Sequence, residues 1–142
     1  EPTTALDVTT QAQILDLIKD LKKDIISSML LISHDLGIIA EICDRVAVMY
    51  TGDIVELAGV KTIFKEPLHP YTLGLLKAIP EINGSKEELG FIPGTIPDLM
   101  NLPPGCKFNL RCPNPLEICL VERPKMKEVR EGHLVACHLH GI

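Results

Sequence analysis

A short, uninterrupted apolar run, Met29-Leu30-Leu31-Ile32, stands directly before Ser33 and the pair His34-Asp35. Apolar runs of this length are typical of strands that are buried on both faces, as in a parallel sheet. In open α/β sheets, ligands bind at the carboxyl ends of the strands, where His34 would lie. The run therefore predicts the edge of an α/β core, with His34 as its first candidate site residue.

Regular elements are predicted on both sides of this run. Ile14, Leu17, Ile18 and Leu21 follow the i, i+3, i+4, i+7 spacing of an amphipathic helix, which Asp7 or Thr10 can cap. Two β-rich runs around a Thr-Gly pair then predict a hairpin. The further elements expected are a helix over Leu36–Cys43, the hairpin strands Arg45–Tyr50 and Asp53–Leu57, and short helices over Val60–Lys65 and Tyr71–Ile79.

The composition changes along the chain and indicates a boundary near Gly84–Gly90. Residues 91–142 hold seven of the 11 prolines and four of the five cysteines of the 142-residue chain. Before the boundary the sequence is typical of regular α/β structure. After it, the Pro-rich sequence with few large apolar side chains suggests a loop-rich module that needs a cross-link.

The overall composition argues against two classes of protein. The chain is 46% apolar, which is enough for a packed core, but it has only three Phe, two Tyr and no Trp. With a net charge of -5 and no stripe of Lys and Arg, it is not expected to bind nucleic acid. Its apolar runs are far shorter than the roughly 18 residues that a transmembrane helix needs.

Four cysteines in the last third, Cys106, Cys112, Cys119 and Cys137, are the candidate cross-link. A zinc site could use all four thiolates, or three of them and a histidine, although a paired C-x-x-C knuckle is missing. An iron–sulfur cluster accepts four thiolates at irregular spacing. Residue chemistry alone leaves zinc and cluster near parity and places disulfides well behind. The histidines available to a zinc site are His133, His138 and His140. Cys43 lies far from the other cysteines in the sequence and is expected to be a small buried hydrophobe.

The order of EPTTALD, a helix and LLISHDLG resembles the second half of an ABC-transporter ATPase domain. The resemblance implies that Glu1 positions or activates the attacking water and that His34 contacts the γ-phosphate of ATP. It also implies that a loop contacts a second ATPase subunit across the bound nucleotide. The residues of this loop are Thr4, Ala5, Leu6 and Asp7.

Two further strings are similar to the ATPase subunits of the dipeptide, oligopeptide and nickel importers. The first is HPYTLGLL with a following Ile92-Pro93-Gly94, in which HPYT is expected to start a helix and to supply an aromatic anchor. The second is the tail pattern GC-x-F-x-x-RC-P, then C, then H-x-x-A-C-H, which holds a four-iron, four-sulfur cluster in some members. The resemblance thus favours a 4Fe-4S cluster on the four cysteines, with zinc as the alternative. Arg111, next to Cys112, is expected to be solvated, and compensation of the cluster's negative charge is the alternative role.

The resemblance implies a cytoplasmic, peripheral membrane subunit that uses ATP and Mg²⁺ to drive peptide uptake. Its partners would be a second ATPase subunit, membrane permeases and, indirectly, a peptide-binding protein. The phosphate-binding loop of the family is not found in these 142 residues, so the chain alone is expected to be inactive. The alternative is a metal- or cluster-binding regulatory module without ATPase function. The expected division is an ATPase remnant over 1–59, a helical linker over 60–90 and a Cys-rich extension over 91–142.

Overall fold

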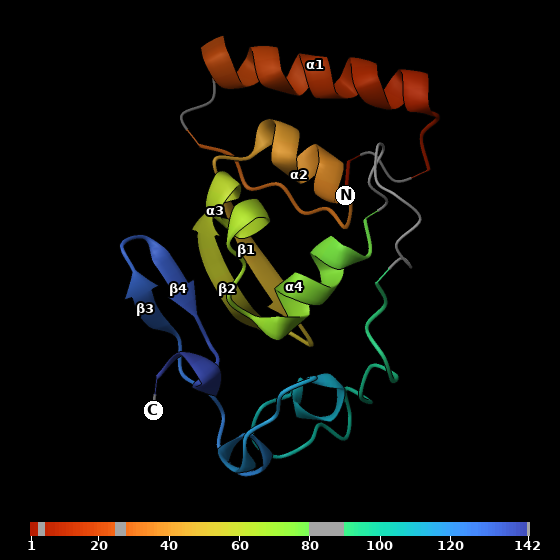
Figure 1. Ribbon diagram of the computed structural model, residues 1–142. Helices are drawn as coiled ribbons and strands as arrows, with labels where there is room; N and C mark the ends of the chain where they lie inside the picture. Colours follow the sequence, from red (N-terminus) through yellow and green to blue (C-terminus); the bar gives the residue numbers. More distant parts are fainter. Residues whose placement is uncertain (3–4, 25–27, 80–89, 142) are drawn as a thin grey trace. The chain divides into compact units, whose positions relative to one another are not determined.

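The computed structural model describes residues 1–2, 5–24, 28–79 and 90–141 of the protein (Figure 1). The chain forms two compact units, Glu1–Asp44 and Arg45–Ile142. No helix in the described ranges is long and apolar enough to cross a membrane.

The first unit is built from two helices, α1 (Val8–Asp24) and α2 (Leu36–Ile42). Both predicted helices are confirmed, and Asp7 rather than Thr10 caps α1, because its Oδ1 accepts the backbone N–H groups of Thr9 and Thr10 at 3.0 Å each. The core of this unit is Leu15 of α1 packed with two residues of α2, and Ile18 and Leu31 border it. Leu17 and Leu21, which the spacing placed on the buried face, are 55% and 36% exposed.

The predicted strand over the apolar run is wrong for this structure. Residues 28–33 form no ladder, and Leu30 and Ile32 are 89% and 67% exposed. A strand is stabilised by hydrogen bonds to a neighbouring strand, and the described part of this unit contains none. The run therefore keeps its apolar character without a sheet to bury it.

The second unit contains a four-stranded sheet in the order β1-β2-β4-β3 (Figure 1). The strands are β1 (Arg45–Tyr50), β2 (Asp53–Gly59), β3 (Lys127–Arg130) and β4 (His133–Val135). The predicted hairpin is confirmed: β1 and β2 pair antiparallel around Thr51 and Gly52, whose φ angles of 43° and 85° fit a primed turn. Every pairing in the sheet is antiparallel, so the expectation of a parallel sheet is not met.

Short helices complete the second unit. α3 (Val60–Lys65) has the predicted bounds, and α4 (Pro70–Lys77) begins one residue before and ends two residues before the predicted helix. Three 3-10 turns follow in the tail: η1 (Asn109–Arg111), η2 (Glu117–Leu120) and η3 (His138–His140). The strands β3 and β4 were not predicted, and through them the tail extends the sheet of the hairpin.

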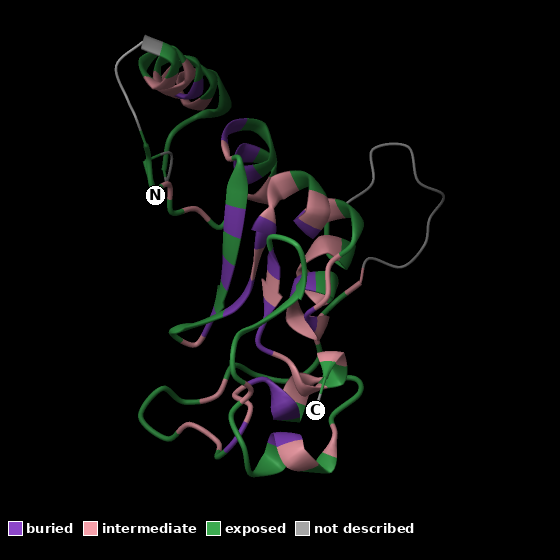
Figure 2. Ribbon diagram, turned by 90° about the vertical axis from the view of Figure 1, so that its left-hand side faces the viewer, coloured by how far each residue is buried: buried purple, intermediate pink, exposed green. Residues whose placement is uncertain are grey.

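The core of the second unit draws on both ends of its sequence. Its buried side chains come from the hairpin, from α3 and from the tail. Buried and exposed residues alternate along β1, and Figure 2 shows how burial varies along the chain. Phe108 of the tail is 2% exposed and packs edge-on against Tyr50 of β1, with ring centroids 5.2 Å apart. The expected boundary at residues 84–90 lies mostly outside the described residues, and the expected three-part division stays a prediction.

Candidate functional site

Two of the predicted site residues, Glu1 and His34, lie in contact in the first unit. The Nδ1 atom of His34 is 2.8 Å from Oε1 of Glu1, although 33 residues separate them in the sequence. A carboxylate only accepts hydrogen bonds, so Nδ1 carries the proton and donates it. This hydrogen bond, followed by the negative charge of Glu1, raises the pKa of His34 above 6.5. The raised pKa favours the imidazolium, whose Nε2–H can donate to an anion, and the side chain is 77% exposed.

Local capping holds His34 at this position. The next residue, Asp35, is the N-cap of α2 and accepts hydrogen bonds from Gly37 N at 2.8 Å and Ile38 N at 3.2 Å. The hydroxyl of Ser33 accepts from the Asp35 N–H at 3.0 Å. Side-chain caps on both sides therefore fix the backbone around His34 in the absence of a strand.

The predicted interface loop is partly described. Ala5 has a φ of 66°, which is rare for a residue with a Cβ, and Leu6 is 38% exposed. Asp7 is engaged as the cap of α1, and its hydrogen bonds with Thr10 are the main cause of its lowered pKa. Thr4 lies outside the described residues. The loop thus presents Ala5 and Leu6 at its surface, with Asp7 as its anchor.

The four tail cysteines each lie beside a short turn of the second unit. Cys106 precedes η1 and Cys112 ends it, Cys119 belongs to η2, and Cys137 precedes η3. Cys106 also donates its backbone N–H to the Cys119 carbonyl at 2.9 Å. Burial raises the pKa of the thiols of Cys106 and Cys112, and that of Cys137 to about 11, with smaller contributions from the neighbouring thiols. All four thiols are free.

The predicted metal centre is not supported by this geometry. Within the described ranges, no three side chains of His, Cys, Asp or Glu lie close enough together to hold one ion. The alternative prediction, a metal-binding regulatory module, needs such a centre and is therefore also unsupported. Cys43, which was expected to be a small buried hydrophobe, is only half-buried.

Arg111 is not a solvated side chain, as was predicted from the sequence. Its guanidinium donates to the carbonyl of Pro93 at 3.0 Å and to that of Ile92 at 3.1 Å. A third, longer hydrogen bond of 3.4 Å reaches the Tyr50 hydroxyl. Arg111 thus fastens the Ile92-Pro93-Gly94 segment to the hairpin and the tail.

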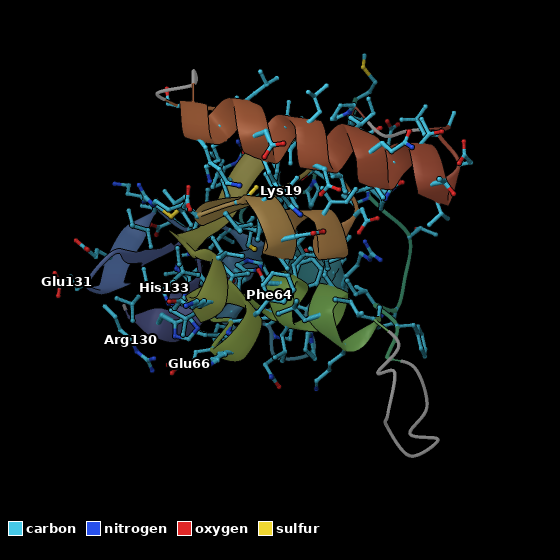
Figure 3. The ribbon with its side chains drawn as sticks, turned by 90° about the horizontal axis from the view of Figure 1, so that it is seen from above. Lys19, Phe64, Glu66, Arg130, Glu131 and His133 are labelled. Carbon is cyan, nitrogen blue, oxygen red and sulfur yellow. The ribbon has the colours of Figure 1, made fainter. Side chains whose placement is uncertain are left out.

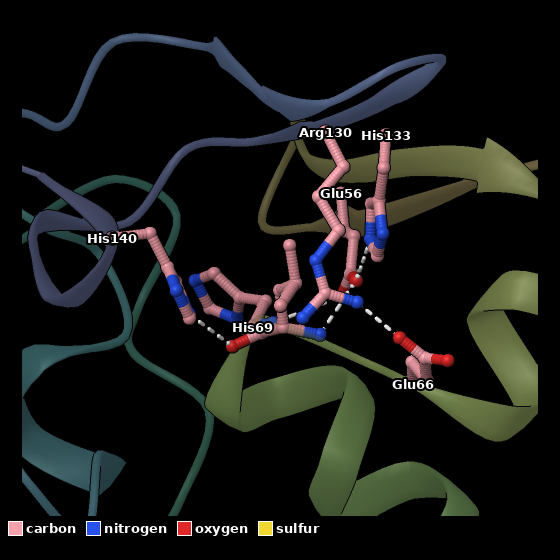
Figure 4. A network of polar contacts seen from close by, with 7 residues as sticks. Glu56, Glu66, His69, Arg130, His133 and His140 are labelled. Atoms are coloured by element: carbon pink, nitrogen blue, oxygen red, sulfur yellow. Dashed lines mark hydrogen bonds and ion pairs between the residues drawn. The ribbon is translucent and has the colours of Figure 1, made fainter.

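A buried carboxylate, Glu56 of β2, is the residue that the sequence reasoning missed. It is fully buried, and its two oxygens accept three hydrogen bonds, from the Leu68 N–H at 2.7 Å, the His69 N–H at 3.0 Å and Nε2 of His133 at 2.7 Å (Figure 4). His133 is itself 1% exposed. A signal was present, since a charged residue inside the apolar stretch Val55–Ala58 of a strand is costly unless it is paired.

Glu56 thereby joins three segments that are distant in the sequence: β2, the start of the HPYT string and β4 of the tail. Two outer contacts reinforce this connection, because His140 Nε2 lies 2.8 Å from the Leu68 carbonyl oxygen and Arg130 forms an ion pair with Glu66 (Figures 3 and 4).

The HPYT string has the structural role that was predicted for it. Nδ1 of His69 accepts the Tyr71 N–H at 3.0 Å and so caps α4, and Pro70 occupies the first turn. Tyr71 is the expected aromatic anchor, with its ring centroid 4.7 Å from that of Tyr50 and 5.5 Å from that of Phe108. The string therefore connects the hairpin, α4 and the tail through one aromatic cluster.

Comparison with known proteins agrees with the resemblance. Residues 55–119 match the family model of the oligopeptide/dipeptide transporter C-terminal region. Over 140 residues the chain is 51% identical to the oligopeptide transport ATP-binding protein AppD of Bacillus subtilis, an alignment that covers 99% of this chain and 43% of the relative. Over nearly its whole length the chain is thus similar to ATP-binding proteins of oligopeptide transport.

Two further peptide-transport ATP-binding proteins are similar to the chain over nearly its whole length. The oligopeptide transport ATP-binding protein OppD of Bacillus subtilis is 54% identical over 136 residues, which are 95% of this chain and 38% of the relative. OppD of Salmonella typhimurium is 46% identical over 137 residues, 96% of this chain and 41% of the relative. The chain thus spans about two fifths of the length of these relatives, and nearly all of it takes part in the match.

Proposed function

We propose that the protein to which this chain belongs is the ATP-hydrolysing subunit of an importer of dipeptides or oligopeptides. The relatives are ATP-binding proteins of oligopeptide transport, and the observation that carries the proposal is the 2.8 Å contact between Glu1 and His34. An acidic group and a histidine in direct contact match what phosphoryl transfer to water needs, namely a group that orients the water and a donor to the transferred phosphate.

The two side chains have different tasks in this proposal. Glu1 orients the attacking water through its carboxylate. His34, held cationic by the same carboxylate, donates from Nε2 to a γ-phosphate oxygen of ATP, where negative charge must be stabilised. Bound Mg²⁺ would neutralise charge on the phosphates.

The loop Thr4, Ala5, Leu6 and Asp7 is the proposed contact with a second ATPase subunit. The positive φ of Ala5 supports this role, because strained backbone persists where surrounding structure or a partner stabilises it. Asp7 would then act indirectly, by fixing the loop to the start of α1. The remaining partners in this proposal are membrane permeases and a peptide-binding protein, at the cytoplasmic face of the membrane, and no nucleic acid.

ATP hydrolysis by the full-length protein, reconstituted with its permease, tests the proposal. Wild type is expected to hydrolyse ATP faster with the permease than without it, and Glu1→Gln is expected to lose nearly all of this activity while still binding ATP. A matched control is Glu41→Gln, an exposed carboxylate on α2 of the same unit. Full activity in Glu1→Gln, or no hydrolysis in wild type, would contradict the proposal.

An iron–sulfur cluster on Cys106, Cys112, Cys119 and Cys137, or zinc as its alternative, rests on the cysteine spacing and on the family pattern alone. The mutual influence of the thiols is compatible with such a group, but the present arrangement does not bring three ligands to one ion. The test is anaerobic purification followed by assay of iron, acid-labile sulfide and zinc. About four iron and four sulfide per chain would support the cluster, one zinc would support the alternative, and free thiols without metal would remove both.

A further inference from the structure

A cavity of about 600 Å³ opens in the second unit and has no part in the proposed ATPase chemistry. It lies between the hairpin turn, His69 of the HPYT string and two tail segments, 105–108 and 123–126. Cavities of 300–1,000 Å³ are the usual size for small-molecule sites. All of its lining residues belong to one compact unit.

The wall of the cavity is mainly apolar and aromatic. Tyr50, Phe108, Met126 and Ala136 line it, and the rings of Tyr50 and Phe108 meet edge to face. Such a wall suits an aromatic or branched apolar group, which gains most from contact with ring faces and edges. The lining therefore provides a place for the apolar body of a ligand.

Most of the charge in the lining is already neutralised. Nζ of Lys107 lies 2.9 Å from Oδ2 of Asp53 and donates to the Thr51 carbonyl at 2.8 Å. Arg123, by contrast, is exposed and has no ion pair or hydrogen bond with any residue that the structure describes. The cavity thus offers one unpaired cation, and its single carboxylate is occupied.

His69 supplies a second, deeper polar group. It is 1% exposed, and its Nδ1 accepts the Tyr71 N–H, so in the neutral ring the proton must be on Nε2. Burial lowers the pKa of His69 to about 4, which keeps the ring neutral at physiological pH. Among the described residues Nε2–H has no acceptor, and His69 lines the cavity, so this donor is left for a ligand there.

We propose that this cavity binds a small amphipathic carboxylate with a second acceptor oxygen, the chemistry of an N-acylated apolar amino acid. Arg123 binds the carboxylate, Nε2–H of His69 donates to the acyl oxygen, and the apolar group packs against Tyr50 and Phe108. The proposal rests on the cavity alone and is independent of ATP hydrolysis. It also gives the histidine of the HPYT string a ligand-binding role in addition to its role as a helix cap.

Calorimetric titration of the full-length protein with N-acetyl-phenylalanine tests the proposal. Saturable binding of one ligand per chain is expected, and N-acetyl-phenylalanine amide, which lacks the negative charge, should bind at least tenfold more weakly, as for the loss of a charge-assisted hydrogen bond. Arg123→Gln should weaken binding of the acid by about the same factor. Arg45→Gln, at an exposed position of β1 outside the cavity, should leave binding unchanged.

The role of His69 is tested without replacing it, because its loss would remove the cap of α4. Adding the ligand should shift the NMR signals of the His69 ring, and those of the exposed His34 ring in the first unit should stay in place. Absence of saturable binding, equal affinity for the acid and the amide, or equal effects of Arg123→Gln and Arg45→Gln would overturn the proposal. An unchanged His69 ring upon saturation would overturn its part in the site.

Discussion

Glu56→Gln should destabilise the second unit severely, although the substitution barely changes the size of the side chain. Both oxygens of Glu56 accept hydrogen bonds, from two backbone N–H groups and from His133, in a site with no exposure to solvent. A carboxamide keeps one acceptor and turns the other into a donor that faces an N–H group. Each buried group left unsatisfied costs about 1–3 kcal/mol, and the carboxamide N–H and the N–H group that it faces are two such groups. We expect a loss of about 2–6 kcal/mol in the free energy of unfolding.

Urea denaturation followed by circular dichroism measures this loss, with Glu117→Gln as the matched control, because Glu117 is exposed in the same unit. Replacing both Glu56 and His133 by Leu adds a sharper test. A buried hydrogen-bonded pair can often be exchanged for apolar residues of similar shape with little loss. Here the Leu68 and His69 N–H groups would still lack acceptors, so the double variant should not recover. A loss below about 1 kcal/mol in Glu56→Gln, comparable with the control, would refute the reasoning.

Three further results are expected. Gly105→Ala should lower the free energy of unfolding by about 3 kcal/mol or more, because φ is 72° and a Cβ would lie 2.4 Å from a backbone oxygen. Gly132→Ala, with φ of 68° and open space around it, should lower it by only about 1 kcal/mol. Urea denaturation measures both losses. The raised pKa of His34 should fall toward 6.5 in Glu1→Gln by NMR titration; its stabilising contribution is complete below pH 6.5 and lost as pH rises through the raised pKa. The NMR ring signals of His69 should not titrate between about pH 5.5 and 8. The contribution of the neutral His69 ring to the stability of the fold is lost as pH falls from 6.5 through about 4.

Elements set by local signals were predictable from the sequence. The bounds of α3 and the hairpin around Thr51 and Gly52 follow from turn chemistry and residue type, and Asp7 was one of two expected caps. The pairing of β2 with β4 was not predictable in this way, because it joins residues about 78 positions apart and β3 carries no buried side chain.

The candidate site shows the same distinction. His34 was expected at the end of a strand, but capping by Asp35 positions it instead, and only the fold reveals its contact with Glu1. Glu56 could have been noticed as a charged residue in an apolar strand, but its backbone and His133 partners, and the backbone carbonyls that Arg111 binds, follow only from the fold. The cysteine spacing and the family resemblance likewise predicted a metal centre at the four cysteines, which the geometry of the described residues does not support.

The most direct test of the account is whether Glu1 and His34 act as one catalytic unit. Single-turnover ATP hydrolysis by the full-length protein should be measured for Glu1→Gln, His34→Ala and the double variant. Residues that act as a unit show strongly non-additive effects. The account predicts that the double variant is no slower than the slower single variant. Losses that multiply in the double variant, or a His34→Ala variant with wild-type rate, would contradict it.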